Sequence, residues 1–443
     1  MVELHILADG FIHNMLAEIL NGRKQLLCHF IIYISIGYHV HDSINAVLFL
    51  VCGLRFQTNF RFLVQAILNR CGIVRYQRKV FIQCGRNQPL CDIVIHPAIR
   101  EEKRAAFCLQ WLKQQGAEDA YIDEALNVVL PIGCTGEKPI SVFMAHSDVV
   151  FPDTTSLPLK IENGRILCPG IGDDTANVVA LMMAAKYILE HNLIPQDQGI
   201  LLVVNSGEEG LGNLKGSRTI MTDFGSRIRE FVSFDGTCRS AVTKAVGSRR
   251  FEINASTQGG HSYADFGNTN AIAVPSELIT RLYQIKVPEL GKTTYNVGII
   301  QGGTSVNTNA QKAQMLYEFR SDERSALGIM QNHFDEAISQ FRRRGYDLSV
   351  ALVGDRPCSG DVDISAMEAL SRRVQDAVYR HFGLEIPLRS GSTDCNIPLS
   401  MGISAICIGC YEGGGAHARE EYVEVDSLLP GLKLALELIL YHF

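Results

Sequence analysis

Short apolar runs that each end in polar residues constrain the fold of this chain more than any other feature. Such runs occupy residues 140–145, 199–204, 231–234 and 403–408. Between the first two, residues 175–190 are rich in Ala, Val, Leu and Met, as expected for a buried helix. Strands that are apolar on both faces and alternate with helices form parallel sheets covered by helices on both sides. The sequence therefore predicts an α/β fold with a mainly parallel sheet.

The residues that follow these strands have the chemistry of metal ligands. His146-Ser-Asp148 follows the first strand, Asn205-Ser-Gly-Glu-Glu-Gly210 the second, and Asp235 the third. Gly172-Asp-Asp174 precedes a helix, and Gly413-Gly-Gly-Ala-His417 follows the last strand. Because ligand crevices of open α/β sheets lie beyond the carboxyl ends of the strands, we expect these groups to converge. Sets of Asp, Glu and His hold divalent metals, and carboxylate-rich sites with His suit two ions.

Each of these residues has a simpler explanation when it is taken alone. A single His or Asp after a strand is more often a capping or solvated residue, and Glu208 and Glu209 could be two solvated acids in a loop. Five such residues at strand ends, most with Gly beside them, make a joint metal site the better interpretation. Adjacent carboxylates can also point in different directions, so that one binds metal while the other takes a proton.

Five motifs along the chain carry a family resemblance. They are Ala145-His-Ser-Asp148, Gly170-Ile-Gly-Asp-Asp174, Ser206-Gly-Glu-Glu-Gly-Leu-Gly212, Phe234-Asp-Gly236 and Gly259-Gly-His-Ser262. In this order they resemble the peptidase T, aminoacylase and succinyl-diaminopimelate desuccinylase family of di-zinc amidohydrolases. The resemblance covers about residues 97–443, and residues 208–216 and 260–268 look most like the tripeptidase-like branch. It implies a zinc-exopeptidase-like catalytic domain.

This resemblance implies a site for two divalent metal ions. Zn is the expected metal, with Co or Mn as alternatives. Asp173 would bridge both ions. His146 and Asp235 would complete the protein ligands of one ion, and Glu209 and His417 those of the other.

Two more carboxylates match family positions with catalytic roles. Glu208 matches the general base, which takes a proton from the bridging water and hands it to the leaving amine. Asp148 matches the carboxylate that orients His146, fixes its tautomer and raises its basicity as a ligand. One position departs from the pattern, because Thr175 follows Asp174 where many relatives have Lys. The local support that this Lys provides must be absent or replaced.

Residues 245–356 have a different pattern of apolar and polar residues and lie between catalytic motifs in the sequence. Alternating and helical patterns predict strands at 250–255, 294–301 and 313–319 and helices at 271–285 and 325–343. Their order predicts an α+β sandwich inserted into the catalytic domain. In the family this insert is the lid and dimerisation domain, so the resemblance implies a homodimer through 245–356.

Three lid residues match functional positions of the family. His261 matches the lid histidine that reaches a metal site, commonly the partner subunit's, and stabilises the oxyanion. Asn307 and Arg320 match positions that contact substrate, and a guanidinium suits the terminal carboxylate of a peptide. Taken alone, His261 would be a turn residue and Arg320 a charge at a strand edge.

Charge and cysteine content limit the classes of binding partner and the cellular compartment that we expect. The chain has 41 basic and 47 acidic residues, which argues against a nucleic-acid partner. The 13 cysteines are scattered, and Cys407 and Cys410 are interpreted as small apolar residues of a buried strand. Acidic residues stand where a secretory signal would be basic, so the cytoplasm is expected.

The N-terminal 96 residues have no recognisable counterpart in the family. They form a divergent region of unassigned role, in which 28–54 is apolar enough to raise a membrane span. Asp42 and two histidines in the middle of that stretch argue against one. The remaining expected divisions are the catalytic domain at 97–244, the lid at 245–356 and the rest of the catalytic domain at 357–443.

The sequence therefore predicts a metal-dependent exopeptidase that removes the N-terminal residue from short peptides. One alternative keeps the metal site but changes the substrate to an N-acyl amino acid, since the lid sets specificity. Another alternative is a metal-binding relative without turnover. Residues Glu208 and all five expected ligands are present, which argues against the last interpretation.

Overall fold

The computed structural model describes residues 101–151 and 159–443, all within one compact unit of the chain. The expected N-terminal region at 1–96, including the apolar stretch 28–54, lies outside these residues. Within the described part, no helix is both long enough and apolar enough to cross a membrane.

A large mixed sheet forms the centre of the catalytic part. Its strand order is β1-β2-β6-β3-β7-β16-β8-β15. The neighbours β6 and β3, β3 and β7, β7 and β16, and β8 and β15 are parallel, whereas β2 pairs antiparallel with β6 and β16 with β8. The bounds are β1 Tyr121–Ile122, β2 Val128–Ile132, β3 Ile140–His146, β6 Gly199–Asn205, β7 Ile228–Ser233, β8 Ala241–Ala245, β15 Leu388–Gly391 and β16 Ser404–Cys407.

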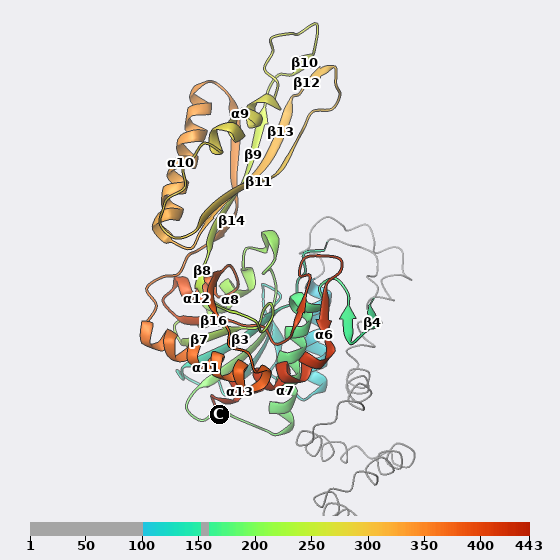
Figure 1. Cartoon of the computed structure of the whole chain (residues 1–443), viewed down its shortest axis with the longest axis vertical. Helices are drawn as coiled ribbons and strands as arrows, with labels where there is room; N and C mark the ends of the chain where they lie inside the picture. The colour runs from blue at the N-terminus through green and yellow to red at the C-terminus, as the bar shows by residue number, and fades with distance from the viewer. Residues whose placement is uncertain (1–100, 152–158) are drawn as a thin grey trace, which may run out of the picture. The chain divides into compact units, whose positions relative to one another are not determined.

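Helices cover both faces of this sheet. On one face lie α6 (Glu101–Gln114), α7 (Asn177–Glu190), α11 (Ile364–Phe382) and α13 (Leu428–Leu440). Figure 1 shows α7, α11 and α13 side by side there. The other face carries α8 (Lys215–Phe224) and α12 (Asn396–Ser400). All seven residues of β3 and of β6 are buried, because these central strands have helices on both sides.

A small four-stranded sheet lies beside the segments that carry two expected ligands. Its order is β17-β18-β5-β4, with all neighbours antiparallel. The strands are β4 Lys160–Glu162, β5 Arg165–Leu167, β17 Gly413–Gly414 and β18 Tyr422–Glu424. Short helical turns complete this part of the chain: η3 Ile171–Ala176, η4 Gly210–Gly212 and η5 Val425–Ser427.

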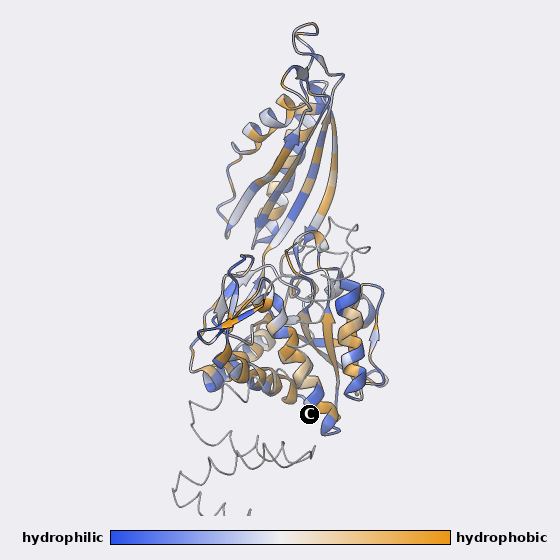
Figure 2. Ribbon diagram, turned by 90° about the vertical axis from the view of Figure 1, so that its right-hand side faces the viewer, coloured by the Kyte–Doolittle hydropathy of each residue, from blue (hydrophilic) through white to orange (hydrophobic). Residues whose placement is uncertain are grey.

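The inserted segment, which the resemblance implies to be a lid, is a four-stranded antiparallel sheet with two helices. The strand order is β11-β13-β9-β14, and α9 and α10 pack on β9 and β13 around Phe334 and other apolar residues (Figure 1). Burial alternates along β13, and the lid strands alternate between hydrophilic and hydrophobic residues in Figure 2. The bounds are β9 Gly247–Ser256, β10 Gly260–His261, α9 Ala273–Leu282, β11 Thr293–Gly302, β12 Thr308–Asn309, β13 Lys312–Ser321, α10 Arg324–Arg343 and β14 Asp347–Arg356.

The architecture confirms the expected fold class, an α/β catalytic part with a mainly parallel sheet plus an α+β insert. The expected helix at 175–190 begins instead at Asn177. Asp173 and Asp174, just before it, have backbone angles outside the helical region. The chain there forms the turn η3, which presents the Asp173 side chain, before the regular helix starts.

Candidate metal centre

The residues that follow three neighbouring strands lie close together at one edge of the large sheet. Because β3 runs parallel to β6 and β7, the carboxyl ends of these strands share that edge, and His146 pairs in register with Asn205. Asp235 follows β7 by two residues, and Glu208 follows β6 by three. The η3 turn and the loop after β17 add Asp173 and His417.

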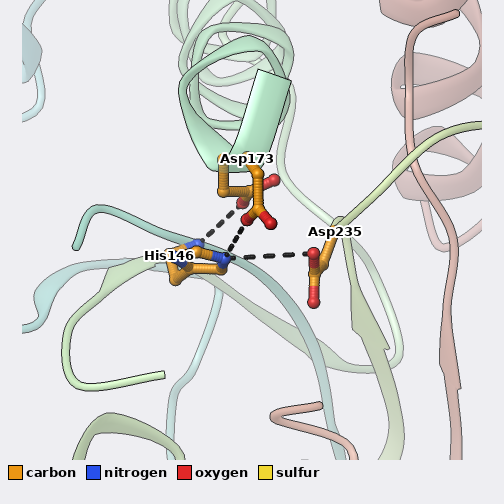
Figure 3. Close-up of side chains that lie close together, drawn as sticks. His146, Asp173 and Asp235 are labelled. Carbon is orange, nitrogen blue, oxygen red and sulfur yellow. Dashed lines mark hydrogen bonds and ion pairs between the residues drawn. The ribbon is translucent and has the colours of Figure 1, made fainter. Parts of the chain in front are cut away.

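Asp173 lies at the centre of the cluster with its two oxygens facing different histidines. Its Oδ1 lies 3.1 Å from Nε2 of His146, and its Oδ2 lies 3.1 Å from Nε2 of His417. Nε2 of His146 also lies 3.9 Å from Oδ1 of Asp235, and Figure 3 shows these three side chains pointing toward one another. On the other side, Oε1 of Glu209 lies 2.9 Å from Nε2 of His417. The five expected ligands are thus together, and Asp173 is shared by both groups.

The His146 ring is oriented so that one nitrogen is available for a ligand. Its Nδ1 lies 3.1 Å from the backbone oxygen of Asp148 and 3.6 Å from the Asp148 carboxylate. The backbone N–H of His146 donates to Asp174, whose other oxygen accepts from Asn177. With Nδ1 directed at these acceptors, Nε2 is the nitrogen that faces Asp173 and Asp235.

The donor set fits divalent metal ions. Nε2 of His146 and Oδ1 of Asp173 are both buried without a hydrogen-bond partner, although they lie 3.1 Å apart. Such an arrangement is costly unless a cation is bound by both atoms. Three sets have ligand atoms within 4.8 Å of one another: His146 with Asp173, Asp174 and Asp235; His146 with Glu208 and Glu209; and Asp173 with Glu209 and His417. Imidazole and carboxylate together suit Zn and similar ions.

The pKa shifts show how strongly the cluster favours positive charge. Although burial alone would lower it, the pKa of His146 is raised well above its ordinary value by Asp174, Asp148 and Asp173. Hydrogen bonds to Asp173 and Glu209 raise the pKa of His417 to about 10. Burial, together with neighbouring carboxylates, raises the pKa of Asp235. An excess of carboxylates over cations within one buried site is what bound metal ions would neutralise.

The loop after β6 presents its two glutamates differently. The backbone N–H groups of Glu208 and Glu209 donate to the Asp148 carboxylate at 3.2 and 2.7 Å. The Glu209 side chain points toward His417. The Glu208 side chain is buried instead, and its carboxylate forms an ion pair with Arg356 at 3.0 Å. Burial raises the pKa of Glu208, and the charge of Arg356 opposes that shift. Asp148 therefore holds the loop of both glutamates as well as contacting His146.

The lid residues expected to reach substrate form their hydrogen bonds with other residues of the lid. His261 is exposed in β10, and its Nδ1 accepts the backbone N–H of Tyr263 at 3.2 Å and that of Ala264 at 3.3 Å. Asn307 is also exposed, and its backbone oxygen accepts the N–H of Ser262 at 3.0 Å, which places it beside His261. Arg320 on β13 instead donates to both oxygens of Glu318, at 2.9 and 3.0 Å.

Several buried groups around the cluster were missed in the sequence analysis. Arg356 at the end of β14 contacts Glu208, and Glu421 accepts three backbone N–H groups near Asp173. Glu101 accepts the N–H of Gly207 and pairs with Lys215. Asp394 accepts from Asn205 at 2.6 Å, and burial with nearby Glu208 raises its pKa to about 7. Glu421 lies four residues after His417, and Asp394 lies in the sequence Gly391-Ser-Thr-Asp-Cys-Asn396 ahead of the last apolar strand.

Two sequence features outside the ligand set have structural counterparts. The hydroxyl of Thr175 donates to the backbone oxygen of Gly170 at 2.5 Å, so this side chain supports the turn that carries Asp173. Cys407 and Cys410 are buried free thiols, and burial raises the pKa of each well above its ordinary value. Both therefore behave as small apolar residues here.

Comparisons with known proteins show which family this chain resembles. The model of peptidase family M20/M25/M40 matches residues 142–441, more than half of the chain. Carboxypeptidase G2 of Pseudomonas sp. (strain RS-16) is 23% identical over 327 residues, 71% of this chain and 76% of its own. Acetylornithine deacetylase of Myxococcus xanthus is 24% identical over 339 residues, 72% of this chain and 84% of its own. The crystal structure of aminopeptidase PepT from Bacillus cereus superposes with a TM-score of 0.58 at 18% identity, covering 82% of this chain and 97% of that chain.

Proposed function

The chain belongs to peptidase family M20/M25/M40, and on that premise we propose that it is a di-zinc aminopeptidase of di- and tripeptides. The observation that carries this proposal is the position of Asp173 between His146 and His417, with the carboxylate of Glu208 close by. One carboxylate shared by two ligand groups is the arrangement that a two-metal hydrolytic site requires.

In this proposal His146, Asp173 and Asp235 hold one ion, and Asp173, Glu209 and His417 hold the other. Bound metal ions supply a water of lowered pKa and polarise the scissile carbonyl. Co or Mn would fit the same ligands.

Glu208 is proposed as the general base. It accepts a proton from the attacking water and passes it to the nitrogen of the leaving amine as the peptide bond breaks. Because Glu208 is buried and held by Arg356, its carboxylate keeps a fixed position beside the ligands instead of rotating in solvent. Asp148 is proposed to orient His146 through Nδ1, and its hydrogen bonds to the Glu208 and Glu209 backbone support that role.

The lid is proposed to complete the site from a partner subunit. Nδ1 of His261 accepts backbone N–H groups, which leaves Nε2 as the nitrogen that carries a proton and can donate to a developing oxyanion. Asn307 beside it is proposed to contact substrate. Arg320 is proposed to bind the peptide carboxylate, which requires its guanidinium to exchange Glu318 for the substrate. A homodimer through 245–356 would bring this group of residues to the neighbouring metal site.

A second candidate substrate is an N-acyl amino acid, favoured by the similarity to acetylornithine deacetylase. The same metal site would cleave either kind of amide. An assay with both substrate classes therefore distinguishes the peptidase from the deacylase. The free thiols of all eight described cysteines fit a reducing compartment, and we propose a cytoplasmic location.

The experiment incubates metal-loaded protein with dipeptides, tripeptides and N-acetyl amino acids and follows the release of free amino acid. Wild type is compared with Glu208→Ala and with Glu420→Ala, an exposed control glutamate. Release from peptides that is lost only in Glu208→Ala supports the proposal. Release only from the N-acetyl substrates supports the deacylase, and equal rates in wild type and Glu208→Ala would show that the proposed base is wrong.

A further inference from the structure

The carboxylate of Glu421 is buried directly behind the turn that carries Asp173. Glu421 is 1% exposed, which is unusual for an acidic side chain. Its Oε2 accepts the backbone N–H of Gly170 at 2.6 Å, and its Oε1 accepts those of Gly172 at 2.8 Å and Asp173 at 2.7 Å. Three backbone donors therefore converge on one carboxylate, and the reaction proposed above gives that carboxylate no role.

The turn itself is shaped to wrap this side chain. Gly170 has a φ of 74°, in the left-handed region that glycine adopts without strain, so the chain can reverse there. Gly172 lets Tyr411 and Glu421 pack closely against the turn, because a Cβ at that position would overlap the Tyr411 ring and its hydroxyl and come 3.0 Å from Oε1 of Glu421. Successive N–H groups directed at one anion form a concave backbone site of the kind that holds anions in other proteins.

Glu421 also connects this turn to the segment of the second histidine. It lies four residues after His417 in the sequence. Its backbone oxygen accepts the N–H of Cys168 at 3.1 Å, and the next residue, Tyr422, pairs with Leu167 in the small sheet. Main chain and side chain of Glu421 thus hold the same stretch that leads to Asp173.

The position of the Asp173 backbone matters because both of its carboxylate oxygens are used. Each oxygen lies 3.1 Å from a different histidine nitrogen. The backbone angles of Asp173, φ −100° and ψ 91°, lie outside a helix, so regular helical hydrogen bonds do not fix them. A small rotation of this peptide would move both oxygens at once, and functional groups must be held to within about 0.5 Å.

We propose that Glu421 is a positioning residue of the metal centre. Its carboxylate fixes the backbone from Gly170 to Asp173, so that Asp173 is held between the two metal sites and at a set distance from His417. This inference rests on the proposed function, because it takes Asp173 as the ligand shared by both ions.

The test compares Glu421→Gln with the matched control Glu420→Gln. Glutamine keeps the size of the side chain, but its NH₂ group opposes backbone N–H donors and cannot accept from them. Glu420 is the preceding residue and is exposed, so its variant removes the same charge without touching the turn. Glu421→Asp adds a third comparison, because it keeps the charge but is one methylene too short to reach all three donors.

Two measurements report on the metal centre apart from turnover. Zinc affinity is measured by competition with a chromophoric chelator, and the absorption spectrum of Co(II)-loaded protein reports ligand geometry. Glu421→Gln and Glu421→Asp should bind zinc about 10–100-fold more weakly than Glu420→Gln and show a changed cobalt spectrum. Their kcat should fall by a similar factor while KM changes little. Zinc affinity and cobalt spectra equal to those of Glu420→Gln would overturn this role.

Failure of the wild type to bind metal would instead overturn the proposed function, and this role with it. Hydrogen exchange of the metal-free wild type covers the case in which the variants do not fold. The segment 168–176 should exchange slowly because Glu421 holds several of its N–H groups, whereas the largely exposed lid segment 286–291 should exchange fast. Equally fast exchange in both segments would contradict the proposal.

Discussion

The guanidinium of Arg356 donates to Oε1 of Glu208 at 3.0 Å and also to the Glu208 backbone oxygen. The two side chains are 5% and 8% exposed. Arg356 is the last residue of β14, so the final lid strand ends in a contact with the proposed base of the catalytic part. Because burial raises the pKa of Glu208, the positive charge of Arg356 keeps this carboxyl closer to the ionised state that a base needs.

Replacing Arg356 with Met should therefore impair the base without removing it. The pKa of Glu208 should rise further, so the acidic limb of the kcat/KM profile should move to higher pH and activity at neutral pH should fall. Breaking a buried pair also leaves an uncompensated charge, so the free energy of unfolding should drop by about 3–5 kcal/mol. Kinetic pH profiles and denaturant unfolding measure the two effects.

Arg372→Met is the matched control for this change. Arg372 is an exposed residue of α11 whose ion pair with Glu368 lies on the surface. Its variant should leave both the pH profile and the unfolding free energy close to those of wild type. An unchanged acidic limb in Arg356→Met would show that Arg356 does not tune Glu208.

Removal of metal should destabilise the protein as well as stop hydrolysis. His146 and Asp173 have buried atoms without hydrogen-bond partners, so bound cations would stabilise the folded state at this cluster. At a metal concentration of 100 times Kd, binding would stabilise the folded state by about 2.7 kcal/mol. Thermal unfolding with and without a chelator measures this shift, and elemental analysis should find two ions per chain. Asp173→Asn should lose both ions, whereas retention of full activity in excess chelator would contradict the metal mechanism.

The sequence predicted the convergence at the sheet edge for a physical reason. His146, Glu208 and Asp235 each follow a strand, and parallel strands end at a common edge. The lid strands and helices were also predictable. The alternating burial along β13 and the helical spacing of buried residues in α10 both follow from the local order of apolar and polar residues. Local periodicity reports which face of an element is buried.

Local periodicity does not report which buried side chains from distant elements meet. Arg356 lies 148 positions from Glu208, and Glu421 lies 248 positions from Asp173, so no spacing in the sequence indicates either contact. The strands of the small sheet span only two or three residues, too few to show an alternating pattern. The pairing of Arg320 with Glu318 is different, because residues two apart on a strand share a face and this contact was within reach of sequence reasoning.

Mixing two inactive variants should test whether His261 acts in the partner's site. His261→Ala should lower kcat about 10²–10³-fold, as loss of an oxyanion donor does, with zinc affinity unchanged. Glu208→Ala should also be inactive. A dimer with one subunit of each kind would contain one site with both an intact Glu208 and an intact His261, so an equimolar mixture should regain about a quarter of wild-type activity. No recovery after exchange of subunits would show that His261 does not act across an interface.

Glu230 on β7 should make stability depend on pH in the acid range. It pairs with Arg373, and its Oε1 lies 3.1 Å from Nε2 of His442 near the C-terminus. Although burial would raise it, the pKa of Glu230 is lowered below its ordinary value of 4.5 by the hydrogen bonds from His442 and Arg373. A carboxyl whose pKa is lower in the folded state stabilises the protein above its unfolded pKa, and this contribution is lost as pH falls through the folded value.

Glu230→Gln should therefore cost about 1.5–3 kcal/mol of unfolding free energy at neutral pH, the usual contribution of hydrogen bonds to a charged group. The difference from wild type should stay constant between about pH 6 and 8 and shrink as pH falls below about 4.5. Denaturant unfolding of metal-free protein at several pH values measures this difference without interference from the metal centre. Glu385→Gln, a change at an exposed glutamate, should show no such loss at any pH. A difference between Glu230→Gln and wild type that grows toward low pH would contradict the assigned direction, because the folded state would then favour the protonated carboxyl and the pKa of Glu230 would be raised.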